Sequence, residues 1–134
     1  MKTGEGPPWR ILFYQSPTGE RVFLNDFKSQ TPRVRAKFVS RLRFLAAAPR
    51  TDWKRPYYDD LKRDGKGLGE VRFETDKVQQ RPLGFFSSTD SFSFVFWAIE
   101  KGQKLVPTSA TDIGLRRKGE LAHNPEQCHE FRLG

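Results

Sequence analysis

The run of apolar residues at positions 92–99 constrains the fold more than any other part of the chain. It reads Phe-Ser-Phe-Val-Phe-Trp-Ala-Ile, and in an extended strand its side chains point alternately to two faces. One face would carry Phe92, Phe94, Phe96 and Ala98, and the other Val95, Trp97 and Ile99. Because both faces are apolar, we expect this segment to be the central strand of a sheet.

Two further apolar runs precede this strand, and short polar linkers join all three. The expected strands are residues 69–74, 78–86 and 92–99, with linkers at residues 75–77 and 87–91. Linkers of this length connect antiparallel neighbours, so we expect an antiparallel meander. Pro82 interrupts the second strand and has no N–H to donate, which predicts a bulge or a locally unpaired edge there.

The N-terminal half is typical of one strand followed by two helices. Residues 9–15 are apolar and β-prone, and residues 22–28 place apolar side chains at helical spacing. Thr31 and Pro32 provide an N-cap and a first helical residue, and the 3.6-residue period that follows ends at Pro49. We expect an ordered loop from there to the first strand of the meander.

The two ends of the chain are mixed and polar. Ser109 and Asp112 resemble a capping box for a short helix ending near Lys118. We expect a flexible lead-in at residues 1–8 and a flexible tail at residues 119–134. The remaining residues, 9–118, predict one small α+β domain, with helices packed on one face of an antiparallel sheet.

Composition excludes several classes of protein. Cys128 is the only cysteine, which excludes an internal disulfide and is typical of a reducing compartment. No apolar stretch approaches ~18 residues and the first residues lack a signal-peptide pattern, so we expect a soluble, cytoplasmic protein without membrane partners. His123, Cys128 and His129 are not spaced as metal ligands, and the glycines at 65–69 lack the helix of a dinucleotide fingerprint. We therefore expect no metal and no small-molecule cofactor.

The positive charge is concentrated in one segment. Residues 28–63 hold eleven of the 24 Lys and Arg but three of the 16 Asp and Glu, so the whole net charge of +8 lies there. Such a block indicates an anionic partner, although a solvated helix face made soluble by its cations is the alternative. Lys37 and Arg41 are spaced to lie on one side of the second helix.

Two arginines, Arg72 and Arg81, fall on adjacent strands of the expected meander. Alternation turns Arg72 away from the face that its apolar neighbours occupy, whereas the direction of Arg81 depends on the geometry at Pro82. If both reach the open face, they form a two-pronged phosphate clamp. The alternative is that one or both pair with Glu70 or Glu74, and exposed pairs of that kind contribute only ~0–1 kcal/mol.

Further cations flank the meander at both ends. Lys62, Arg63 and Lys66 precede its first strand, and Lys101 and Lys104 follow its last. Antiparallel geometry would bring both groups to the rim of one sheet face, although simple solubility explains each of them equally well. The expected core has no histidine to act as a general base. The remaining means of catalysis are stabilisation of charge in the transition state and orientation of the substrate. Such a domain would therefore need another macromolecule to position an RNA substrate.

The order of elements and several motifs together resemble a known family. The segments that carry the resemblance are Trp-Arg-Ile-Leu-Phe-Tyr from Trp9, the helical residues 33–45, Leu61-Lys62, Gly-Leu-Gly-Glu-Val-Arg-Phe at 67–73, and Arg81 with Phe85-Phe86. The chain resembles the RelE/HigB-type toxins of bacterial type II toxin–antitoxin systems, in the phage-derived branch of Gp49-like proteins. This resemblance covers residues 9–118.

The resemblance implies a RelE-like fold and ribosome-dependent cleavage of mRNA, in which a 2′-hydroxyl attacks the adjacent phosphate. It implies a cognate helix-turn-helix antitoxin, the ribosome and mRNA as partners. Carried over residue by residue, it places Arg72, Arg81, Lys101 and Lys66 in catalysis. Contacts to RNA fall to Lys37, Arg41, Lys62, Arg63 and Lys104. Gly102 stands where the family usually has a second lysine, a departure that concerns catalysis more than the fold.

Two other functions are compatible with the same pattern. A chain of this fold can act without catalysis, by holding RNA, DNA or a partner protein, and a gyrase-directed toxin is a further possibility. Fold alone does not decide between them.

Overall fold

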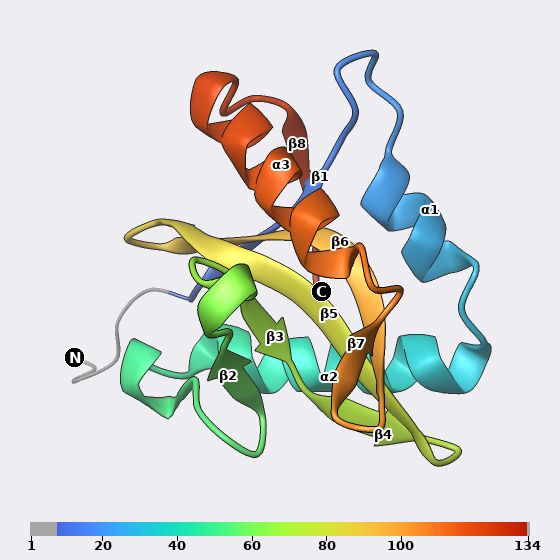
Figure 1. The fold of residues 1–134 in the computed structure, drawn as a ribbon. Helices are drawn as coiled ribbons and strands as arrows, with labels where there is room; N and C mark the ends of the chain where they lie inside the picture. The colour runs from blue at the N-terminus through green and yellow to red at the C-terminus, as the bar shows by residue number, and fades with distance from the viewer. Residues whose placement is uncertain (1–7, 134) are drawn as a thin grey trace, which may run out of the picture.

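An eight-stranded sheet forms the centre of the molecule, with helices on both of its faces (Figure 1). The structure is a computed structural model that describes residues 8–133. The class is α+β, as expected, with three α-helices and a mixed, mostly antiparallel sheet. Almost all of the lead-in expected at residues 1–8 lies outside the described residues.

The expected meander is present at the centre of the sheet. The strands run in the order β2 (Tyr58–Asp60), β3 (Gly69–Val71), β5 (Val78–Ser88), β6 (Ser91–Lys101), β1 (Arg10–Tyr14) and β8 (Cys128–Glu130). Two short strands lie off this path: β4 (Phe73–Thr75) pairs with β5, and β7 (Lys104–Val106) pairs with β6. The sheet is not wholly antiparallel, because β1 pairs with β6 in parallel. The long segment between them, which holds two α-helices and the strands β2 to β5, forms the crossover that a parallel pair requires.

A bulge in β6 overturns the expected alternation of its side chains. Phe96 is in register with Leu83, but Phe94 is already in register with Gly84, which leaves Val95 as the extra residue. After Val95, even-numbered side chains of β6 point to the sheet face opposite to the one that Phe92 and Phe94 occupy. Phe92, Phe94 and Trp97 therefore join one core cluster, whereas Val95, Phe96 and Ala98 belong to the other.

Pro82 lies where the partner of β5 changes. The residues after it pair with β3, and the residues before Arg81 pair with β4. The ladder on this side is interrupted at Arg72, whose N–H donates to the carbonyl of Tyr57 (2.9 Å). A missing N–H therefore costs no ladder bond at this position, which agrees with the locally unpaired edge that the sequence predicts.

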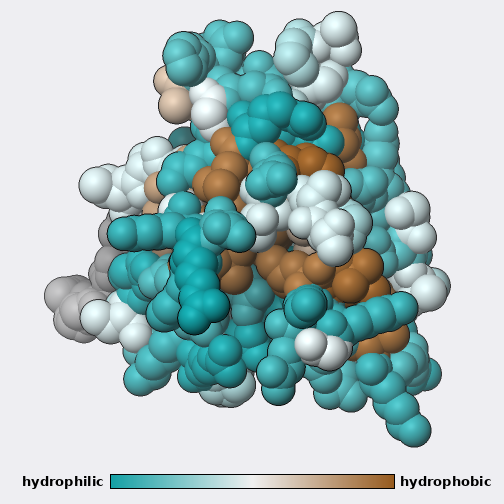
Figure 2. Space-filling model, in the orientation of Figure 1, coloured by the Kyte–Doolittle hydropathy of each residue, from teal (hydrophilic) through white to brown (hydrophobic). Residues whose placement is uncertain are grey.

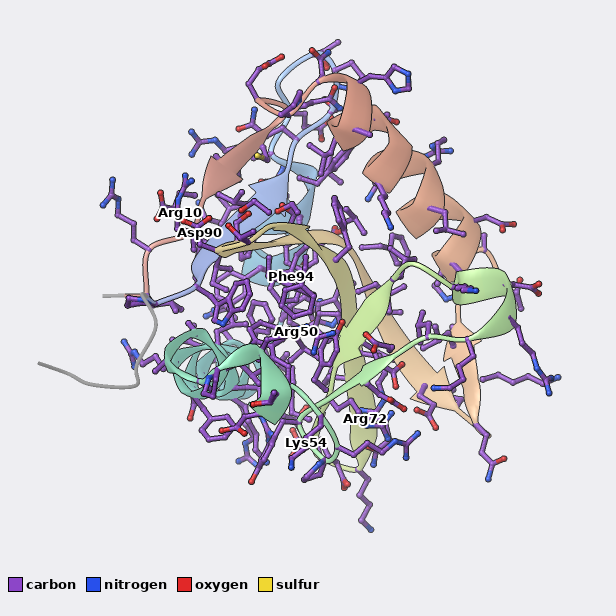
Figure 3. The ribbon with its side chains drawn as sticks, turned by 90° about the vertical axis from the view of Figure 1, so that its left-hand side faces the viewer. Arg10, Arg50, Lys54, Arg72, Asp90 and Phe94 are labelled. Atoms are coloured by element: carbon purple, nitrogen blue, oxygen red, sulfur yellow. The ribbon has the colours of Figure 1, made fainter. Side chains whose placement is uncertain are left out.

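Two helices cover one face of the sheet. The helix α1 (Val22–Lys28) precedes α2 (Pro32–Ala47), and the Thr31 side chain accepts a hydrogen bond from the N–H of Val34 (3.3 Å), as expected for an N-cap. The side of α2 that faces the sheet packs into an aromatic core around Phe94 (Figure 3). Rings such as Phe38 and Phe94, with centroids 5.3 Å apart, fill this layer.

The third helix and the C-terminal strand correct the expected tail. The helix α3 (Ala110–His123) lies on the opposite face of the sheet and continues five residues beyond Lys118. The segment after it contributes to the sheet and the core, because β8 pairs with β1 and the Phe131 ring stacks on Phe13 with centroids 4.5 Å apart. Ser109 precedes α3, but its side chain forms no capping bond.

The expected loop between α2 and the meander carries short regular elements. These are the 3₁₀ helices η1 (Arg50–Asp52) and η2 (Arg63–Gly65), with the edge strand β2 between them. Trp53 and Tyr58 are buried and hold the loop against the sheet. In the part of the chain that the structure describes, no helix is long and apolar enough to cross a membrane.

Candidate functional site

Four charged side chains meet on the α3 side of the sheet. Val71 and Phe73 pack into the core on the other side, so alternation directs Glu70 and Arg72 toward this face. Arg81 is in register with Ala98, which also belongs to the α3 side. Glu100, near the end of β6, completes the group.

The four side chains form a connected network of ion pairs. Arg72 donates through Nη1 to Glu70 Oε2. The Nε of Arg81 lies 2.9 Å from Glu100 Oε1 and 3.9 Å from Glu70 Oε2. Two guanidinium groups thus face two carboxylates, and the formal charges of the group cancel. We refer to Glu70, Arg72, Arg81 and Glu100 as the charge network.

Arg81 is not the free phosphate ligand that a two-pronged clamp requires. Its side chain is 3% exposed, and its Nη1 and Nη2 donate to the carbonyl of Gln80 (2.8 Å) and to Gln79 Oε1 (3.0 Å). Its main carboxylate partner is Glu100, which the sequence reasoning did not consider. For Arg72 the alternative of pairing with Glu70 is the observed one. Arg72 is 15% exposed, so it is the guanidinium that borders open space.

Burial changes the acidity of Glu70. The side chain is 7% exposed, and this burial raises the pKa of the carboxyl above its ordinary value, while the positive charge and hydrogen bond of Arg72 oppose the rise. A carboxyl group with a raised pKa beside a guanidinium is suited to proton transfer.

The charge network lies at the floor of an open cavity of about 580 Å³. Glu70, Arg72 and Glu100 form its base. Its walls are Arg55, the segment 59–62 that ends β2 and follows it, and the residues Gln103 and Leu105 of the β6–β7 hairpin. Figure 2 views the molecule from the α3 side, on which hydrophilic side chains surround patches of apolar surface. In Figure 3, Arg72 lies at the end of the sheet remote from Arg10 and Asp90. We call this space the first cavity.

A second cavity of about 650 Å³ lies on the other side of the same wall. Asp60, Leu61 and Lys62 line both cavities. Lys66 lines the second cavity and is not among the residues that line the first, so the structure separates it from Arg72. Lys62 is the predicted cation that faces both.

The other predicted cations lie apart from the charge network. Lys101 and Lys104 are cross-strand partners on the β6–β7 hairpin, and Lys104 lines a shallow third cavity together with Lys62 and Arg63. Lys37 and Arg41 lie on α2, across the sheet from the cavities. The Lys37 ammonium donates to the carbonyl of Glu74 (2.9 Å).

Arg41 and Tyr57 form a cation–aromatic contact on the α2 side. The Arg41 guanidinium lies 4.8 Å from the centroid of the Tyr57 ring, and its burial lowers the pKa of Arg41. The predicted RNA-binding residues therefore fall on two separate surfaces rather than one.

The sequence predicts Glu70 only as a possible ion-pair partner of Arg72, not as a catalytic residue, and Glu100 was not considered. The signal for Glu70 was present, because residues two apart on a strand share a face, and Glu70 precedes Arg72 by two positions. The role of Glu100 depends on the pairing of β5 with β6, which local sequence does not reveal. Within residues 8–133, no group of three or more His, Cys, Asp or Glu side chains is arranged to hold a metal ion.

Comparisons of the chain with family models, with curated proteins and with solved structures found no match. The likeness to RelE/HigB-type toxins therefore depends on the sequence motifs alone.

Proposed function

We propose that this chain is an endoribonuclease toxin of the RelE/HigB type, which cleaves mRNA on the ribosome and is held inactive by a helix-turn-helix antitoxin. The observation that carries the proposal is Glu70 and Arg72 together at the floor of the first cavity. The motifs around these residues and the α+β class agree with it. The concentrated positive charge suits a polyanionic substrate.

The chemistry assigned to the cavity needs no cofactor. The 2′-hydroxyl of one nucleotide gives its proton to the Glu70 carboxylate as its oxygen attacks the adjacent phosphorus. Arg72 stabilises the negative charge that develops on the phosphoryl oxygens. The bond from phosphorus to the 5′-oxygen breaks, and the leaving oxygen takes a proton from Lys62, which lines the same cavity.

This assignment changes the roles expected from the resemblance. Arg81 becomes a positioning residue, because its contacts hold Glu100 and the backbone of β5 rather than open space. Lys66 and Lys101 are replaced by Lys62 in proton transfer, since neither lines the first cavity. Arg72 keeps the role that the resemblance implies.

One observation favours a second function, a non-catalytic module that binds RNA. Each guanidinium of the charge network already has a carboxylate partner, so the floor of the first cavity carries no net positive charge. On this alternative, the cations outside the network would bind RNA and no bond would be cleaved.

Induced expression in a bacterial host tests the proposal. We expect growth arrest by the wild-type chain, with new mRNA 5′ ends inside translated codons. Glu70→Gln and Arg72→Gln should each abolish the cuts, whereas the matched control Arg33→Gln, which alters the exposed pair with Asp76, should not. Normal growth with folded wild-type protein, or cuts that persist in both site variants, would refute the proposal. Salt-sensitive RNA binding without cuts would support the binding module.

A further inference from the structure

The second cavity combines an apolar floor with a basic rim. The floor includes the half-buried ring of Phe85 and the buried side chain of Leu68. Tyr58 extends across Gly69, where a Cβ atom would lie 1.8 Å from the Tyr58 hydroxyl. Glycine at this position therefore allows the tyrosine ring to form part of the cavity.

Four cations surround this floor: Lys62, Arg63, Lys66 and Lys118. The Lys118 ammonium lies 5.3 Å from the centroid of the Phe85 ring and donates to the carbonyl of Gly67 (2.8 Å). Within residues 8–133, no carboxylate lies within ion-pair distance of Lys62, Arg63 or Lys66.

The one acidic residue of this lining is already engaged. Asp60 accepts a hydrogen bond from the Tyr58 hydroxyl (3.0 Å) and lies 3.6 Å from Arg50 Nη2. Unlike the floor of the first cavity, the second cavity therefore presents uncompensated positive charge beside an aromatic face. A ligand that fits both features has a flat apolar group joined to an anion.

We propose that the second cavity is a subsite for one nucleotide of single-stranded RNA, with its base stacked on Phe85 and its phosphate held by the surrounding lysines. Stacking on an aromatic side chain and phosphate contacts to cations are the two usual means of binding single strands. The wall shared with the first cavity makes this nucleotide a neighbour of the cleaved linkage. That last statement, but not the binding itself, depends on the proposed function.

Binding of a short RNA that cannot be cleaved tests the subsite. We would titrate the full chain with a labelled RNA pentamer carrying 2′-O-methyl groups, and with the same pentamer lacking its bases. Phe85→Leu keeps apolar volume but removes the aromatic face, so we expect it to weaken binding of the first pentamer about 5- to 150-fold. It should leave binding of the base-free pentamer unchanged. The control Phe44→Leu alters an aromatic residue of α2 that is 46% exposed, and it should have no effect.

The outcomes separate this subsite from the nuclease. Equal binding of the two pentamers by the wild-type chain, or equal affinities of wild type and folded Phe85→Leu, would overturn the subsite even if mRNA is cut in cells. The expected loss in Phe85→Leu, with no cuts in cells, would support the subsite and reject the nuclease. Circular dichroism of each variant checks that it is folded.

Discussion

At the scale of single residues, Glu70 has two roles that oppose each other. Buried among protein atoms, its carboxylate is costly to ionise, and the guanidinium of Arg72 offsets part of that cost. The same burial keeps the carboxyl ready to accept a proton at a pH above the ordinary range of a glutamate. The residue to which we assign proton transfer is therefore also one whose charge is costly to bury.

Glu70→Gln tests the catalytic half of this argument. A glutamine has the same shape but accepts no proton, so we expect the rate of mRNA cleavage on purified ribosomes to fall about 10²- to 10⁴-fold. The wild-type rate should rise with pH through the raised pKa of Glu70, because the base works as the carboxylate. That rise should be missing from the residual activity of the variant. An unchanged pH profile in Glu70→Gln would assign the proton acceptor to another group.

Arg81→Met tests the positioning role of the buried arginine. The change leaves Glu100 without its main partner and removes the bonds to Gln79 and Gln80. Breaking a buried ion pair from one side costs about 3–5 kcal/mol, and we expect a loss of that size in the free energy of unfolding measured in urea.

The matched control for Arg81→Met is Arg33→Met, which breaks a pair in which both side chains are well exposed. It should leave the free energy of unfolding nearly unchanged. Equal stability of Arg81→Met and wild type would mean that the charge network does not hold the sheet together.

Arg72 and Arg81 show which features of the site can be predicted from the sequence and which cannot. The direction of Arg72 and its pairing with Glu70 follow from alternation along one short strand, and both were among the expected alternatives. The burial of Arg81 does not follow, because it depends on which residues of β6 lie opposite β5. The pairing of β5 with β6 shifts twice on the way to Arg81, at Phe86/Ser88 and at Leu83/Gly84, and neither shift can be read from one strand alone.

At the scale of elements, β8 shows what local patterns miss. Its three residues, Cys128 to Glu130, carry no strand signal, yet they add an edge to the sheet beside β1. Long-range contacts hold the segment, namely Phe131 on Phe13 and the Gln127 amide bonded to the carbonyl of Gln15 (2.9 Å). The strands of the meander and the first two helices were predictable because each has its own hydrophobic pattern, and α2 also has the Thr31 cap.

The pH dependence of the melting temperature should report whether His129 is buried in this edge strand. His129 of β8 is half-buried, and its Nε2 has no hydrogen-bond partner among residues 8–133. Burial lowers the pKa of His129 below its ordinary value near 6.5. The folded state therefore binds this proton less readily than the unfolded chain does. The stabilisation is present above that ordinary value and is lost as the pH falls through and below it.

Thermal melting at pH 7 and pH 5 measures the effect. We expect His129→Gln to lose less of its melting temperature on acidification than the wild-type chain does. The exposed histidine at the end of α3 is the control, so His123→Gln should behave as wild type. A His129→Gln variant with the wild-type pH dependence would mean that β8 does not bury this histidine in solution.

At the scale of the whole molecule, the cations divide between two surfaces. Lys37 and Arg41 lie on α2, whereas Lys62, Arg63, Lys66 and Lys118 surround the cavities across the sheet. A single basic segment in the sequence is thus split by the fold. On the proposed function, one surface would hold the single strand and the other would contact a second polyanion, the ribosomal RNA.

The salt dependence of RNA binding distinguishes these two surfaces. Single strands release about 0.7 counterions for each phosphate that a cation neutralises, so contacts from about four cations predict a slope near −3 in log K against log salt. Replacing Lys62 and Lys66 by alanine should reduce the magnitude of this slope by about 1.4 for a short RNA. Replacing Lys37 and Arg41 should not change it, because a short strand in the cavities does not reach α2. The opposite pattern would place the RNA on the helical face and leave the cavities without a substrate.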